Sequence, residues 1–318
     1  MNSARMTDQE IESLTQALES LQGGPMAAAA LVACGERAIP SLRDYLLRGR
    51  PRGIYQPRQL AVETLARLGA KEVLIEYLSA PATIKDPVVR MGEDAVRSTA
   101  ARELGRWRSE DVFECLSRLA LDSILPGVVE SLGGFRRIGS MPYFLLALGD
   151  GVCRTQAEEA IRGLGEAARS VLIDAVNTHT PSAEEETPSS FQRRRCALRI
   201  LLDVGVSERD WGRLEGLLAE NDPDIAITAA RIGIESAPPP VKLLAIQRIV
   251  DRLPTAGWFL RTEARAALAE HFDLAQETVE AEIARRRTAG TKEQALDVIL
   301  RLLVNLRNQR AEADLMRR

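Results

Sequence analysis

The chain has 318 residues, of which 45% are apolar but only 4% aromatic, so we expect a large core of Ala, Leu, Val and Ile. A formal net charge of −3 excludes a strong overall field for nucleic acid or an anionic membrane surface. The 22 glycines and 15 prolines exclude collagen-like and low-complexity chains.

The first ten residues are polar and lack the apolar stretch of a signal peptide. No run approaches the roughly 18 apolar residues that cross a bilayer. Four cysteines lie in apolar helical patterns without a C-x-x-C pair: Cys34, Cys115, Cys153 and Cys196. We interpret them as small buried residues in a reducing compartment, which indicates a cytoplasmic protein. A disulfide or a zinc site is the weaker alternative, because neither histidine lies near a cysteine in the sequence.

One phrase recurs along the chain, in which an apolar helical run ends at glycine and a second helical run follows. It reads LVACGERAIPSLRDYLL at 31–47, AVETLARLGAKEVLIEYL at 61–78 and AEEAIRGLGEAARSVLIDAV at 157–176. Apolar residues at i, i+3, i+4 and i+7 predict amphipathic helices, and a glycine at C′ ends a helix in the left-handed conformation. The closing glycines are Gly35, Gly69, Gly105, Gly139, Gly165, Gly205 and Gly233.

These segments resemble HEAT repeats, in particular the short bacterial variety found in phycobilisome lyases. The resemblance is carried by AIP at 38–40, by DP before a second helix, and best by NDPDIAITAARIG at 221–233. It covers roughly residues 25–235. It implies an all-α protein whose helix pairs stack into a right-handed α-solenoid, and it says little about function.

In that family each repeat consists of a first helix, a turn, a second helix and a short turn at the glycine. With this phase, we expect about nine helix pairs in a single array over 1–318. The first helices are predicted near 7–22, 36–48, 71–79, 109–121, 140–149, 166–177, 207–220, 238–252 and 273–288. The second helices are predicted near 25–34, 57–68, 93–104, 126–138, 151–164, 190–204, 223–235, 257–271 and 291–310.

Three connections within pairs are long, at 49–56, 79–92 and 177–189, and the phase predicts all three on one edge. Insertions on one edge often mark a binding edge, although a surface insertion alone also explains them. The 177–189 segment is rich in Ser, Thr, Pro and Glu and is expected to be a flexible loop. The segment around Arg50, Arg52 and Tyr55 combines positive charge with an aromatic ring, which suits an acidic partner.

Arginines recur at two positions of the second helices. Arg58, Arg154 and Arg194 lie eleven residues before a closing glycine, and the resemblance implies a structural role, with Asp150 available to Arg154. A second set lies two or three residues before the glycine: Arg67, Arg102, Arg136, Arg137, Arg162 and Arg231. We interpret this set either as cations at the negative ends of helix dipoles or as a basic stripe on the concave surface.

The sequence contains no phosphate-binding loop, zinc-protease motif or nucleophile elbow. Two enzymes built on similar repeats are alternatives, a bilin lyase or isomerase and an alkylpurine DNA glycosylase. Mixed charge and sparse aromatics oppose the glycosylase, and the lack of His-Glu dipeptides opposes a HEAT-like hydroxylase. We predict no cofactor and no metal.

The last predicted helix, 291–310, is apolar at eight of the eleven positions 296–306. A helix that is apolar nearly all round must be buried on more than one face. The charged tail 307–318, a second copy of the chain or another protein could supply the cover, and an irregular last repeat is the alternative. We predict a homodimer or partner contact through Leu296, Leu300, Leu303 and Val304.

Together these features predict a non-enzymatic scaffold or adaptor that binds a protein or peptide on the concave face or on the long-loop edge. The alternative is a protein that binds a nucleic-acid backbone with the arginine stripe. An enzyme ranks third.

Overall fold

The computed structural model describes residues 6–51, 53–81, 84–179, 181–182, 185–289 and 293–316. These residues form eighteen α-helices and one short antiparallel pair, β1 (Pro181–Ser182) with β2 (Glu185–Glu186). The all-α prediction is confirmed. Within the described residues, no helix combines the length and apolar character needed to cross a membrane.

Each of the eighteen predicted helices has an observed counterpart. The first helices of the pairs are α1 (Asp8–Ala17), α3 (Ile39–Arg48), α5 (Lys71–Ser79), α7 (Glu110–Asp122), α9 (Met141–Leu148), α11 (Arg169–Asn177), α13 (Glu208–Trp211), α15 (Pro239–Arg252) and α17 (Phe272–Thr288). The second helices are α2 (Gly24–Ala33), α4 (Gln56–Arg67), α6 (Pro87–Leu104), α8 (Pro126–Phe135), α10 (Arg154–Arg162), α12 (Pro188–Val204), α14 (Pro223–Ser236), α16 (Trp258–Glu270) and α18 (Glu293–Met316). Short 3-10 helices are η1 (Gly35–Ala38), η2 (Ile138–Ser140), η3 (Gly165–Ala168), η4 (Glu215–Ala219) and η5 (Leu253–Thr255).

Proline and short acidic side chains begin many of these helices. Nine of the eighteen have proline at the first or second position, where its missing N–H costs nothing. Before Pro87 and Pro223, the carboxylates of Asp86 and Asp222 accept backbone N–H groups of the first turn. The predicted DP signal before a second helix is therefore an N-cap followed by an N1 proline.

Two element predictions are wrong in detail. Helix α6 begins at Pro87 instead of 93, so much of the predicted 79–92 loop is helical and the connection is 80–86. The single helix predicted at 207–220 is replaced by α13 and η4. Gly212 and Gly216 lie in this segment, and glycine is a poor helix former.

Four of the seven closing glycines adopt a positive φ: Gly35, Gly69, Gly165 and Gly205. Gly105, Gly139 and Gly233 have no positive φ, so the prediction of a left-handed glycine is wrong at these three positions. A Cβ at Gly105 would lie 2.2 Å from Ser131 Oγ, and one at Gly233 would lie 2.7 Å from the Trp211 ring. Close packing between helices, rather than chain reversal, therefore explains glycine at these two positions. At the end of α8 the left-handed residue is Arg136, with φ 52°.

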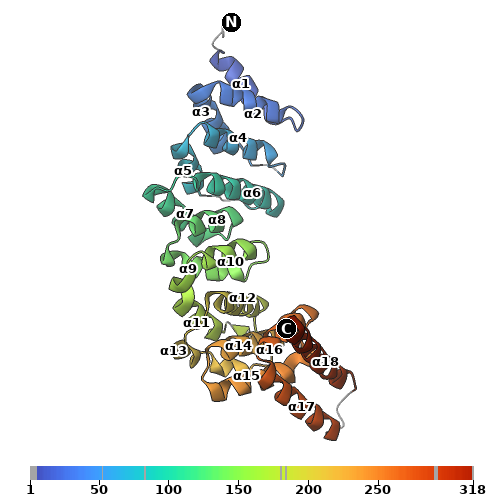
Figure 1. Ribbon diagram of the computed structural model, residues 1–318. Coiled ribbons are helices and arrows are strands. Elements are labelled where there is room, and N and C mark those ends of the chain that lie inside the picture. Colours follow the sequence, from blue (N-terminus) through green and yellow to red (C-terminus); the bar gives the residue numbers. More distant parts are fainter. Residues whose placement is uncertain are drawn as a thin grey trace. The chain divides into compact units, whose positions relative to one another are not determined.

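The contacts group the chain into two compact units, Met1–Leu164 (unit 1) and Gly165–Arg318 (unit 2). In unit 1 the second helices contact one another in the order α2, α4, α6, α8 and α10 (Figure 1). The first helices α1, α3, α5 and α7 do the same. The backbones of α6 and α8 approach closely, since Ser98 Oγ accepts a 2.9 Å hydrogen bond from Gly127 N–H.

The second helices of unit 2 also contact one another in chain order: α12, α14, α16 and α18. Helix α14 has nine buried residues and contacts α12, α15 and α16. The last helix α18 packs against α16, α17 and η5, so three neighbours share its apolar surface.

Candidate functional site

Most arginines of the predicted basic stripe form ion pairs with glutamates. Arg102 pairs with Glu130 of the next second helix at 2.8 Å, and Arg231 pairs with Glu263 at 2.6 Å. The other pairs are Arg162 with Glu158 at 3.1 Å and Arg137 with Glu110 at 2.6 Å. These contacts neutralise most of the stripe, and all but the Arg162–Glu158 pair, which lies within α10, connect different elements.

Arg137 has the most extensive contacts of this set. Two hydrogen bonds, of 2.7 and 2.6 Å, join its guanidinium to the two oxygens of Glu110, and they lower the pKa of that carboxyl. The guanidinium also lies 4.1 Å from the centre of the Phe113 ring. Arg137 therefore acts as a structural cation in this arrangement.

The remaining predicted partner-binding residues are one further member of the stripe, Arg67, and the residues around the second connection. Arg67 and Arg50 are exposed and have no carboxylate partner in the described part of the chain. Tyr55 is half-buried just before α4. Arg52 lies outside the described residues.

Buried arginines of the second helices bind the carbonyl ends of the first helices. Arg58 donates to Leu46 O at 3.1 Å, and Arg194 donates to Val176 O at 2.7 Å. Arg97 does the same to Leu78 O at 3.0 Å, and half-buried Arg261 donates to Pro254 O of η5, just after α15, at 2.8 Å. A cation at this position satisfies free carbonyls and the negative end of the helix dipole. The structural role predicted for Arg58 and Arg194 agrees with this geometry.

Arg154 differs from the other members of its predicted set. Its buried Nε has no hydrogen-bond partner among the described residues. The carboxylate of Asp150, which the sequence offered as its partner, instead accepts the N–H groups of Val152 and Cys153 at 2.8 and 2.9 Å.

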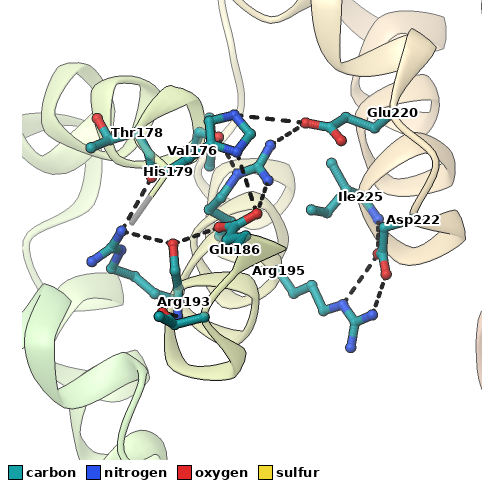
Figure 2. Close-up of polar contacts among 12 residues, drawn as sticks. Val176, Thr178, His179, Glu186, Arg193, Arg195, Glu220, Asp222 and Ile225 are labelled. Atoms are coloured by element: carbon teal, nitrogen blue, oxygen red, sulfur yellow. Dashed lines mark hydrogen bonds and ion pairs between the residues drawn. The ribbon is translucent and has the colours of Figure 1, made fainter. Parts of the chain in front are cut away.

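In unit 2, Arg194 of α12, which binds the carbonyl end of α11, is part of a charged cluster beside the third long loop. Arg194 is fully buried and pairs with Glu186 of β2 at 2.7 Å and with Glu220. Figure 2 shows the His179 ring between the same carboxylates, with Nδ1 3.3 Å from Glu186. Buried Glu186 thus attaches the 178–187 connection to α12; positions 180, 183 and 184 of the predicted flexible loop lie outside the described residues.

The first four connections within pairs of unit 1 lie between helices that contact one another in succession. We call their described residues, 18–23, 49–51, 53–55, 80–81, 84–86 and 123–125, together with the exposed side chains within five residues of them, the loop edge. Neighbouring connections share cavities. A cavity of about 300 Å³ lies between the first connection and the start of α4, one of about 280 Å³ between the second and third connections, and one of about 600 Å³ between the third and fourth. The first two long loops predicted to share an edge therefore lie side by side.

Large apolar side chains are exposed all along the loop edge. Each connection has at least one in it or within five residues: Leu21, Met26, Ile54, Val88, Met91, Leu121 and Ile124. Their exposed fractions range from 37% to 86%. Unit 1 has three other exposed large apolar side chains among the described residues: Ile138, Leu146 and Val152, the last of which lies in the fifth connection, between α9 and α10. The concentration of apolar surface on one edge is typical of an interaction site.

The largest loop-edge cavity, of about 600 Å³, combines apolar and charged groups. Leu78 and Leu119 form part of its wall, and the guanidinium groups of Arg90, Arg97 and Arg118 line it. Asp94 lies in the same wall without a hydrogen bond or ion pair to a described residue, and burial raises the pKa of its carboxyl. A partly buried carboxylate without a partner lowers the stability of the fold, and such groups occur often at functional sites.

The described residues contain no group of three or more His, Cys, Asp or Glu side chains arranged to hold a metal ion. Cys115, Cys153 and Cys196 are buried and Cys34 is half-buried, all as free thiols. Burial raises the pKa of Cys115, and that of Cys153 to about 12, which favours the protonated thiols.

The row predicted as a contact on α18 is covered only in part. Ile299, Leu302 and Leu306 are buried against the neighbouring helices. Leu296, Leu300 and Leu303 are half-buried, and Val304 is 57% exposed. The irregular packing of the last pair accounts for much of the apolar surface, and the contact itself stays a prediction.

The sequence analysis included Val88 and Met91 in the predicted 79–92 loop without singling them out, because the helix that carries them was predicted to begin at 93, and it did not single out Asp94. The Asp86–Pro87 pair was the signal that would have placed the first turn of α6 there. Comparison with known proteins adds no relative, since no protein-family model matches the chain and no curated protein matches it significantly.

Proposed function

We propose that this chain is a non-enzymatic scaffold or adaptor of the cytoplasm that binds a segment of a partner protein along the loop edge of unit 1. The observation that carries the proposal is the row of seven exposed apolar side chains over four neighbouring connections. An apolar row bordered by cavities suits a protein segment, whose side chains fill the cavities in turn.

The packing of like helices within each unit supports a further part of this proposal, that the pairs form a HEAT-like right-handed solenoid. In such arrays each pair contacts only its neighbours, and the connections of successive pairs come to lie on one long surface. A surface of this kind binds extended partners.

The arginine stripe supports the alternative function less well. A nucleic-acid backbone requires cations free to neutralise phosphates, whereas Arg102, Arg137, Arg162 and Arg231 are held by glutamates. Binding of a nucleic acid would have to break these pairs.

Site-specific photo-cross-linking in the producing cells tests the proposal. A photoreactive residue replaces Met91 on the loop edge or, as the matched control, Ile138, an exposed apolar residue at the other end of the helices. We expect a discrete protein adduct from position 91 that survives nuclease and is absent from position 138. Nuclease-sensitive adducts, or equal adducts from both positions, would contradict the proposal.

A further inference from the structure

Several cations at the loop edge have no carboxylate partner among the described residues, and Arg90 donates to the Ile84 carbonyl at 3.0 and 2.7 Å. Arg118 is exposed, and its one hydrogen bond, of 3.4 Å, goes to the Glu114 carbonyl of its own helix. Lys85 and Arg50 have no carboxylate partner among the described residues. Asp86, in contrast, is occupied by the N–H groups of Val88 and Val89 at 2.8 and 3.1 Å.

These cations lie close to apolar surface. Arg90 and Arg118 line the largest loop-edge cavity together with Leu78, Pro81, Ile84 and Leu119. Arg97 is buried between this cavity and the smaller one beside it, and it lines both. A side chain that enters the larger cavity therefore meets an apolar wall first and guanidinium groups beside it.

We propose that the loop edge selects an acidic apolar peptide segment, one of whose carboxylates binds in the largest cavity beside Arg90 and Arg118 while its apolar side chains cover Val88 and Met91. This inference rests on the proposed function and specifies its partner. Guanidinium groups at an apolar wall recognise a carboxylate by charge-assisted hydrogen bonds that water competes with weakly.

The other charges of the cavity favour a peptide over a nucleic acid. Asp94 and Asp122 line the same cavity as the three arginines. A phosphate chain carries closely spaced negative charges and would meet both carboxylates. A peptide whose acidic residues alternate with apolar ones can place a single carboxylate beside the guanidinium groups.

A display library of short random peptides, selected on the full chain, tests this inference. We expect the selected peptides to be enriched in Asp and Glu next to large apolar residues and depleted in Lys and Arg. Fluorescence polarisation of one selected peptide then compares three variants. Arg118→Gln should weaken binding about fivefold, Asp94→Asn should strengthen it, and Ile138→Asp should leave it unchanged.

The outcomes distinguish failure of this inference from failure of the proposed function on which it rests. Peptides that lose binding in Val88→Asp with Met91→Asp but show no acidic enrichment would overturn the inference and leave the proposed function standing. Peptides insensitive to the Val88 and Met91 changes, or no selected peptides at all, would overturn both. Equal weakening by Arg118→Gln and Asp94→Asn would also overturn the inference, because it would indicate a structural effect without charge recognition.

Discussion

The guanidinium of Arg58 donates two hydrogen bonds to the carboxylate of Glu93, of 3.0 and 2.9 Å, and both side chains are buried. Arg58 lies on α4 and Glu93 on α6, so the pair joins the second and third helix pairs. Tyr77 of α5 donates a further 2.6 Å hydrogen bond to Glu93. Arg58 also donates a hydrogen bond to the Leu46 carbonyl at the end of α3. Burial raises the pKa of the Tyr77 hydroxyl, which therefore stays a donor.

Removal of one member of this pair should destabilise unit 1 strongly. Glu93→Ala leaves a buried guanidinium without its counter-charge, for which we expect a loss of about 3 kcal/mol or more in urea unfolding. The matched control is Glu130→Ala, which removes the half-exposed partner of Arg102 and should cost about 1 kcal/mol or less. Similar losses in the two variants would mean that the Arg58–Glu93 pair contributes no more than a surface pair.

Local patterns in the sequence predicted the helices well and the contacts between them poorly. The apolar period and the glycines, counted in the phase of the HEAT-like resemblance, predicted a counterpart for every α-helix because these signals act within a few residues, although α13 and η4 replace one predicted helix. The partners of Arg58 and Arg102 lie 35 and 28 residues away, and no local pattern specifies them. Arg97 and Arg261 were missed because the spacing was counted back from a closing glycine, and α16 ends without one.

The positive φ of Gly165 should make this position intolerant of a side chain. Its φ is 58°, and no atom lies within 4 Å of an added Cβ, so any cost comes from the backbone alone. We expect Gly165→Ala to lose about 1 kcal/mol in thermal unfolding. Gly139→Ala is the control, since Gly139 has open space and no positive φ. A loss in the control as large as in Gly165→Ala would refute the conformational explanation.

The raised pKa of Asp94 predicts a pH-dependent gain of stability in Asp94→Asn. Burial disfavours the carboxylate, so the folded state binds a proton more tightly than the unfolded state does. Ionised Asp94 therefore destabilises the fold at pH 7, and the variant should unfold at higher urea there. Below the ordinary pKa of 3.8 the carboxyl is protonated in both states, and the gain should vanish. A gain that is constant across this range, or a loss at pH 7, would contradict the assignment.

The partly covered row on α18 leads to a prediction about assembly. If a second copy covers it, light scattering should give the mass of a dimer for the native chain. Leu300→Glu with Leu303→Glu should then give a monomer, and so should Val304→Glu, which changes a more exposed side chain. A monomeric native chain would exclude the homodimer and leave a different protein as the cover.

The central claim, that a protein segment binds along the loop edge of unit 1, is tested most directly by calorimetric titration with a peptide selected on the full chain. Val88→Asp with Met91→Asp places charge in the apolar row, and we predict that it weakens binding by about tenfold or more, while Ile138→Asp keeps the native Kd. A native Kd in the loop-edge variant, or an equal loss in Ile138→Asp, would contradict the claim.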